Sequence, residues 1–175
     1  MAGHSKWKQI KHKKEVTDKR RGRVFSKLLR AIRIAAKNES NPDFNPRLRT
    51  AVEKAKEAQV PQENIKRALS ESDNKNLEEI IMEAYGPSGS AIIIEAITDN
   101  RNRTTNEIKN ILSDLDAKFA LPGSVRWAFA PPSPENMSWQ PKFKQELKQE
   151  DKEKLIQIIE ALEEHDDVQK VSTNA

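Results

Sequence analysis

The sequence contains no cysteine, which excludes disulfide bonds, thiol catalysis and cysteine-ligated metal sites. Aromatic residues make up only 5% of the 175 residues and apolar residues 35%, so any hydrophobic core must be lean. No apolar run approaches the roughly 18 residues that a membrane span requires, and the basic start is not followed by the apolar region of a signal peptide. We therefore expect a cytoplasmic protein with no membrane partner.

Acidic residues are scarce at the start of the chain, where basic residues are dense. Residues 1–37 contain thirteen Lys and Arg but only Glu15 and Asp18, whereas residues 70–175 contain twelve basic and twenty acidic residues. Clustered cations gain free energy when they release counterions from phosphates. This asymmetry predicts a nucleic-acid-binding segment attached to an acidic body. The alternative is a charged helix face that is only solvated.

The first 70 residues predict helices. Apolar residues between positions 24 and 36 recur every three or four positions, which indicates an amphipathic helix from about residue 17. Asn45 and Pro46 are typical of the start of a second helix, and Pro61 separates that helix from a third. We expect a flexible basic arm, a basic three-helix domain and a linker, over residues 1–15, 16–69 and 70–76 respectively.

The remainder, residues 77–175, predicts a sheet with helices. Strands are expected over residues 80–85, 91–98, 123–129 and 168–172, and helices over 106–115 and 151–164. This order predicts a sandwich of one sheet with helices packed on one face. The expected fold class of the chain is thus mixed, α plus α/β. Residues 130–150, which are rich in Pro and Lys and include Trp139 and Phe143, are interpreted as a surface connection.

The basic segment supplies most candidate binding residues. Lysine provides charge without fixed geometry, which favours contacts to the nucleic-acid backbone over readout of bases. Trp7 either stacks on an exposed base or packs the arm against the helices. The candidate nucleic-acid-binding residues are His4, Lys6, Trp7, Lys8, Lys11, His12, Lys13, Lys14, Arg20, Arg21, Arg23, Lys27, Arg30, Arg47 and Arg49.

A second candidate is the turn over residues 99–104, between a predicted strand and a predicted helix. Arg101 and Arg103 either reach phosphate from this turn or pair with acidic residues of the body, and Asn102 or Thr104 could cap the helix. A helix-turn-helix arrangement of the first three helices is a further hypothesis. The mixed charge of the second helix fits that arrangement poorly, because a helix that reads bases usually offers Asn, Gln and Arg.

The sequence offers no catalytic constellation. His4 and His12 are eight residues apart with no established metal-ligand spacing, and the chain contains neither a nucleophile elbow nor a phosphate-binding glycine loop. We therefore expect no enzyme activity, no metal and no cofactor.

Several phrases resemble one protein family. GHSKWKQIKHKK, RGRVFSKLLRAI, NPRLRTAVEKAK, YGPSGSAIIIE and DNRNRT occur in this order, and together they resemble the YebC family, which includes the mitochondrial translational activator of cytochrome c oxidase. The resemblance implies a basic helical domain, an α+β domain and a non-enzymatic role in gene expression. Family members usually carry a further lobe after the segment that matches GSVRWAF. Here residues 130–150 stand in its place, as in a short member without that lobe.

The resemblance leaves more than one partner open. Members are described as transcriptional regulators that bind DNA, and others as translation factors that relieve stalled ribosomes. We therefore expect a nucleic-acid partner, either promoter DNA or ribosomal RNA, and in the second case the ribosome. The alternative is a protein-interaction module that uses the acidic α+β domain.

Overall fold

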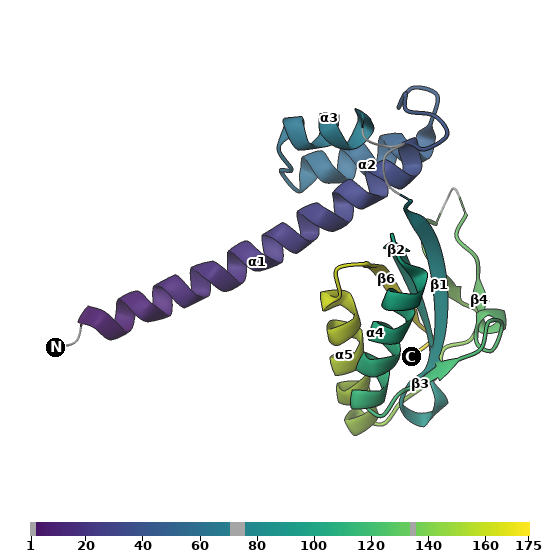
Figure 1. The fold of residues 1–175 in the computed structure, drawn as a ribbon. Helices are drawn as coiled ribbons and strands as arrows, with labels where there is room; N and C mark the ends of the chain where they lie inside the picture. Colours follow the sequence, from purple (N-terminus) through teal and green to yellow (C-terminus); the bar gives the residue numbers. More distant parts are fainter. Residues whose placement is uncertain (1–2, 71–75, 134–135) are drawn as a thin grey trace. The chain divides into compact units, whose positions relative to one another are not determined.

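The computed structural model describes residues 3–70, 76–133 and 136–175, with only the backbone described for residues 3–15 (Figure 1). The chain divides into two units, Met1–Lys75 and Asn76–Ala175. None of the helices in these described ranges combines the length and the apolar character needed to cross a membrane.

The first unit consists of three helices, α1 (Gly3–Ala36), α2 (Pro46–Glu57) and α3 (Gln62–Ser70). Asn45 is the N-cap of α2, as expected, because its side chain accepts a hydrogen bond from the Leu48 backbone N–H at 3.0 Å. The same side chain donates to the carbonyls of Ala35 and Glu39 at 2.8 Å, which ties the end of α1 to the start of α2. The buried core of the unit is Ile32, Ala35, Ala36, Leu48, Val52, Ala55, Val60, Ile65 and Ala68.

Helix α1 begins earlier than the sequence pattern suggested. The expected flexible arm over residues 1–15 is replaced, from Gly3 onward, by helical backbone that continues without a break to Ala36. Apolar periodicity is weak there, but the segment contains no proline, and Lys and Gln are good helix formers. Among the α1 side chains that are described, residues 16–36, the apolar side chains packed against the core of the unit begin with the partly buried Phe25, Leu28 and Leu29.

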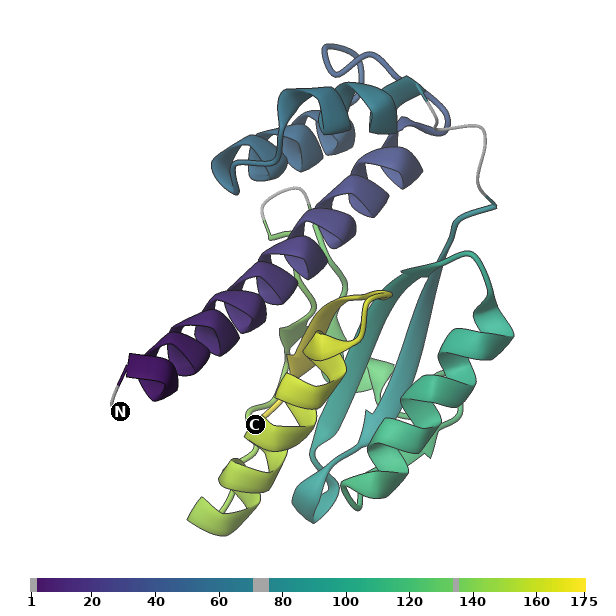
Figure 2. The same ribbon diagram turned by 60° about the vertical axis from the view of Figure 1, so that its left-hand side comes forward.

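The second unit contains a four-stranded antiparallel sheet in the order β3-β1-β2-β6. Its strands are β1 (Glu78–Tyr85), β2 (Ala91–Thr98), β3 (Lys118–Ala120) and β6 (Val168–Thr173). Helices α4 (Arg101–Asp114) and α5 (Gln149–Glu164) lie side by side on one face of this sheet in both ribbon views (Figures 1 and 2). The predicted sandwich with helices on one face is therefore confirmed, and with it the mixed fold class.

The two faces of the sheet are both covered. Ile80, Met82, Ile92 and Ile94 belong to the larger core, which is completed by Ile108 and Leu112 of α4 and by Leu155, Ile158 and Leu162 of α5. On the opposite face, a smaller core contains Ala91, Ile93, Val125, Ala128, Phe129 and Trp139. Burial of β2 on both faces explains its continuous apolar run, AIIIEAI, which does not alternate with polar residues.

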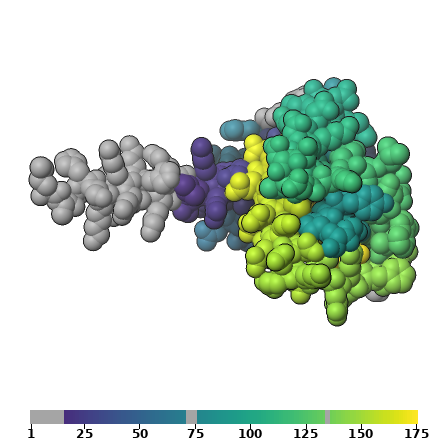
Figure 3. Space-filling model, turned by 90° about the horizontal axis from the view of Figure 1, so that it is seen from below, coloured from purple at the N-terminus to yellow at the C-terminus, as the bar shows by residue number. Residues whose placement is uncertain are grey.

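The turn between β1 and β2 contacts the segment that leads into α5. It contains the 3₁₀ helix η1 (Pro87–Gly89), and the Ser88 hydroxyl donates to Asp151 at 2.6 Å. Gln145 donates from its side chain to the Ser88 carbonyl at 2.8 Å. In the space-filling view this turn, in blue-green, lies against the yellow-green segment that includes the start of α5 (Figure 3).

Two predictions for the second unit were wrong. Residues 123–129 do not form a strand of the main sheet: they contain the 3₁₀ helix η2 (Arg126–Ala128) and enter the short strand β4 (Phe129–Ala130), which pairs with β5 (Gln140–Pro141). Nor are residues 130–150 only a surface connection. Trp139 and Leu147 are each 8% exposed and belong to the cores, whereas Phe143 is exposed.

Candidate nucleic-acid interface

The basic residues of the first unit fall into exposed and half-buried groups. Arg20 and Arg21 on α1 are exposed, whereas Arg23, Lys27 and Arg30, closer to the packed end of the helix, are half-buried. The Arg21 guanidinium lies 5.2 Å from the centroid of the Phe25 ring, a cation–π contact that orients this side chain along the helix. Arg20 and Arg21 therefore place two exposed cations on the same helix as the other candidate residues of the basic segment.

Arg47 and Arg49 flank Leu48 in the first turn of α2 and are both exposed. Arg49 donates to the carbonyls of Pro42 and Asp43 at 3.2 and 2.8 Å, so it fastens the loop that precedes α2. This guanidinium contributes positive potential to the surface, but part of its hydrogen-bonding capacity is used within the unit.

The other candidates of the basic segment lie on the first turns of α1. The helical backbone there is described, but the side chains of His4, Lys6, Trp7, Lys8, Lys11, His12, Lys13 and Lys14 lie outside the described residues. Their positions on one helix with Arg20 and Arg21 make a continuous basic element, which differs from a separate flexible arm.

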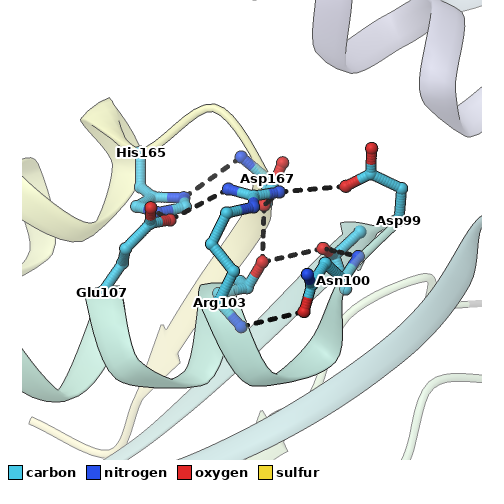
Figure 4. Close-up of polar contacts among 8 residues, drawn as sticks. Asp99, Asn100, Arg103, Glu107, His165 and Asp167 are labelled. Atoms are coloured by element: carbon cyan, nitrogen blue, oxygen red, sulfur yellow. Dashed lines mark hydrogen bonds and ion pairs between the residues drawn. The ribbon is translucent and has the colours of Figure 1, made fainter.

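The turn over residues 99–104 is a structural joint rather than an open anion site (Figure 4). Asn100, and neither Asn102 nor Thr104, is the N-cap of α4, because its side chain accepts from the Arg103 backbone N–H at 3.1 Å. The Arg103 guanidinium contacts three carboxylates, at 2.8 Å from Asp167, 3.0 Å from Asp99 and 3.0 Å from Glu107. Burial alone would lower the pKa of Arg103, but these carboxylates raise that pKa above its ordinary value.

A buried hydroxyl pair extends this joint into the core. The Thr104 hydroxyl lies 2.7 Å from the Thr98 hydroxyl and donates to Asp167 at 2.6 Å. The Asp167 side chain is only 1% exposed, so its charge depends on Arg103 and Thr104 for stabilisation. The joint thereby links the end of β2, the start of α4 and the start of β6.

Three groups in this joint have the composition of a metal site. Ligand atoms of Glu107, His165 and Asp167 lie within 4.8 Å of one another. However, His165 accepts the Asp167 backbone N–H on Nδ1 at 3.2 Å and faces Glu107 with Nε2 at 2.9 Å, while Arg103 binds both carboxylates. The guanidinium supplies the positive charge that a metal ion would provide.

Arg101 is also paired within the second unit. Its guanidinium binds Glu78 through two nitrogens, at 2.8 and 3.1 Å, and both side chains remain largely exposed. Of the two readings that the sequence left open for Arg101 and Arg103, the geometry favours pairing with acidic residues of the body.

The sequence reasoning missed Glu83, whose side chain is 1% exposed in the middle of β1. Its carboxylate accepts backbone N–H groups of Gly123 at 2.7 Å, Val125 at 2.8 Å and Arg126 at 3.0 Å. Burial alone would raise the pKa of Glu83, but these hydrogen bonds and the Arg126 guanidinium outweigh it and hold the pKa below its ordinary value. The signal for this role in the sequence was a single acidic residue within an otherwise apolar stretch of a predicted strand.

The exposed pair Trp127 and Phe143 was also missed. Trp127 is 66% exposed and Phe143 61% exposed, although large aromatic side chains are usually buried. The available signal was composition, since Arg126 precedes Trp127 and lysines flank Phe143 on both sides. The same combination of aromatic and basic residues drew attention to Trp7.

Comparison with known protein families gives matches from residue 5 to residue 175. The model described as the TACO1/YebC protein N-terminal domain matches residues 5–84, and the model described as the TACO1/YebC second and third domain matches residues 77–133 and 130–175. The two parts of the second match overlap at residues 130–133. These residues begin the connection 130–150, which stands where other family members are expected to carry a further lobe.

Named relatives and a solved structure agree with these models. Proteins named probable transcriptional regulatory protein are 51% identical in Chloroherpeton thalassium and 48% identical in Aquifex aeolicus, each over 134 residues. These alignments cover 74% of this chain and 54% of each relative, so the chain spans about half the length of the relatives it matches. The crystal structure of a conserved hypothetical protein from Aquifex aeolicus has a TM-score of 0.81 at 31% identity, covering 88% of this chain and 89% of that chain. The chain therefore belongs to the TACO1/YebC family.

Proposed function

We propose that this protein is a non-enzymatic regulator of gene expression that binds nucleic acid through α1 and the start of α2. The observation that carries the proposal is the exposed part of α1, which presents Arg20 and Arg21 beyond the region packed against α2 and α3. The names of the relatives, probable transcriptional regulatory protein, support a regulatory role.

The chemistry of this surface favours phosphate contacts. Cations on a helix gain affinity for a polyanion by counterion release, whatever the base sequence. Beyond the first turn of α2, the exposed charged residues Glu53, Lys54, Lys56 and Glu57 sum to zero net charge, and this part of the helix is a poor candidate for reading bases in a groove. Binding through α1 is thus expected to be strongly salt-dependent and weakly sequence-specific.

Substitution of the exposed arginines tests the proposal. In the full chain, Arg20→Gln with Arg21→Gln should weaken binding to a duplex DNA by about tenfold at moderate salt and reduce the magnitude of the salt slope by about 2. The matched control is Lys54→Gln with Lys56→Gln, which removes two exposed charges from α2 instead. Fluorescence anisotropy over a salt series gives both quantities. Equal affinity and equal slope for the α1 variant and the wild type, on DNA and on RNA, would contradict the proposal.

The physiological partner is promoter DNA or ribosomal RNA, and the same surface serves either. Sedimentation of lysates at low salt separates the two: co-migration with ribosomal particles that is lost in the α1 variant supports a translation factor. Retention of the wild type on promoter DNA over competitor duplex supports a transcriptional regulator. A protein-interaction role for the acidic second unit is the alternative, and it predicts full activity of the α1 variant in cells.

A further inference from the structure

An exposed aromatic pair lies on the second unit, far along the sequence from the basic helix. The ring centroids of Trp127 and Phe143 are 6.4 Å apart and their planes are tilted by 50°. Both side chains are more than half exposed, and Leu121, in the same loop region as Trp127, is 76% exposed. Two exposed aromatic rings that lie together form the kind of apolar patch that marks a surface for a ligand.

The aromatic pair rests on a fixed support. The Trp127 indole N–H donates to the Ser124 carbonyl at 2.9 Å, and the Tyr85 hydroxyl donates to the same carbonyl at 3.1 Å. The backbone of this loop is held by Glu83 through three N–H groups, as described above. Trp127 is therefore orientated before any ligand arrives, which reduces the entropy lost on binding.

Two lysines lie beside the pair, although the unit as a whole is acidic. Residues 76–175 contain eleven basic and eighteen acidic residues. Yet Lys142 places its ammonium 3.2 Å from the Trp127 carbonyl, and Lys144 follows Phe143 as an exposed side chain. An anionic ligand with flat apolar groups matches this surface, whereas a purely apolar protein segment leaves the lysines without a counterpart.

We propose that Trp127 and Phe143 form a stacking site for two neighbouring unpaired bases of a single-stranded nucleic acid, with Lys142 and Lys144 at its phosphates. The 50° tilt prevents both rings from stacking on one base, so each ring receives its own base. A single strand can splay two bases in this way, but a duplex cannot without unpairing them. The inference rests on the proposed function for the class of partner, and it adds a selectivity for single strands that the cations of α1 do not provide.

The test uses the full chain and two probes of equal length, an oligouridylate of about 12 nucleotides and an RNA duplex of about 12 base pairs. The variant Trp127→Leu with Phe143→Leu keeps apolar side chains but removes the aromatic faces. It should lower affinity for the single strand by about tenfold or more and leave duplex affinity within about twofold. The control Ile156→Ala changes an exposed apolar residue of α5 and should change neither affinity.

Two further measurements keep the outcome decisive. Lys142→Gln with Lys144→Gln should weaken single-strand binding and reduce its salt slope. Photo-crosslinking of the unmodified protein to iodouridine-substituted strand should place the adduct on Trp127 or Phe143, which needs no folded variant.

The results separate this inference from the proposed function. Loss of all binding in the Arg20 and Arg21 variant, with unchanged single-strand affinity in the leucine variant, overturns the stacking site alone. The stacking site is also overturned if Trp127→Leu with Phe143→Leu keeps its affinity for nucleic acid but loses binding to a protein that the wild type binds. Binding of single strands that requires Trp127 but not Arg20 and Arg21 supports the stacking site and counts against the proposed role of α1.

Discussion

Glu83 is the residue on which the loop over residues 121–128 depends. A buried carboxylate normally carries a large desolvation cost, but here three backbone N–H groups and the Arg126 guanidinium at 3.2 Å compensate for it. A carboxylate that accepts several N–H groups is favoured in its charged form, which is why its pKa falls below the ordinary value. The loop therefore gains stability from ionised Glu83 and loses it on protonation.

We expect Glu83→Gln to destabilise the protein by about 2–3 kcal/mol at neutral pH, because the amide group turns a donor toward backbone donors. The folded-state pKa of Glu83 lies below that of the unfolded chain, about 4.3. The stabilisation is therefore complete above that pH and is lost as the pH falls through the lower, folded-state pKa. Urea unfolding of wild type and variant across this range should show the difference narrowing in acid.

The control for this pH series is Glu146→Gln, which changes an exposed carboxyl. It should shift stability by less than about 0.5 kcal/mol at every pH. A Glu83→Gln difference that stays constant from neutral pH to acid would show that packing, rather than the charge, supports the loop.

Thr104 has a comparable role in the joint between α4 and β6. Thr104→Val keeps the shape but leaves the Thr98 hydroxyl and Asp167 without this buried partner, and it should cost about 1–3 kcal/mol. Arg101→Gln breaks the exposed pair with Glu78 and should cost less than about 1 kcal/mol. Thermal unfolding monitored by circular dichroism compares the two, and equal losses would contradict the assignment of the joint to the core.

At the scale of elements, the sequence predicts most of the fold. Periodicity located α2, α4, α5 and the β1–β2 hairpin, because each has one buried face or a characteristic turn. It failed at residues 123–129, where Val125 and Phe129 are buried and alternate with exposed Trp127, as in a strand. The hydrogen bonds that bend this segment come from Glu83, about 40 residues earlier, and such distant contacts leave no local pattern.

The same limit applies to the candidate site. The basic residues of α1 were recognised from composition, since charge density needs no knowledge of the fold. The pairing of Arg103 with Asp167 could not be recognised, because the two residues are 64 positions apart and meet only when β6 joins the sheet. Helix α1 was underestimated at its start because its first turns lack an apolar stripe.

Gly22 lies within α1, where a Cβ atom would meet nothing within 4 Å. Gly22→Ala should therefore stabilise the helix by about 0.5–1 kcal/mol and raise the helical circular dichroism signal. Gly22→Pro should have the opposite effect, since proline removes a hydrogen bond and costs about 3 kcal/mol in a helix interior. A signal that neither substitution changes would mean that the two halves of α1 are not one continuous helix in solution.

At the scale of the whole molecule, the chain combines two units with separate cores and different charge. The core around Ile32 and Leu48 draws only on residues of the first unit, and the cores around Ile94 and Phe129 only on the second. The dense basic segment belongs to the first unit, while the second has eleven basic against eighteen acidic residues and is therefore net negative. A substitution in the core of one unit is therefore expected to lower the stability of that unit and to leave the stability of the other unchanged.

Core substitutions test this independence. Ile32 is fully buried, so Ile32→Ala should cost about 2–5 kcal/mol. This is a large part of the free energy of unfolding expected for a small unit of three helices. Amide hydrogen exchange should then accelerate across α2 and α3 and stay unchanged in β1 and β2. The matched variant Ile94→Ala, at a fully buried position of β2, should produce the reverse pattern. Faster exchange in both units after either substitution would mean that they unfold together, since protection within one cooperative unit is lost as a whole.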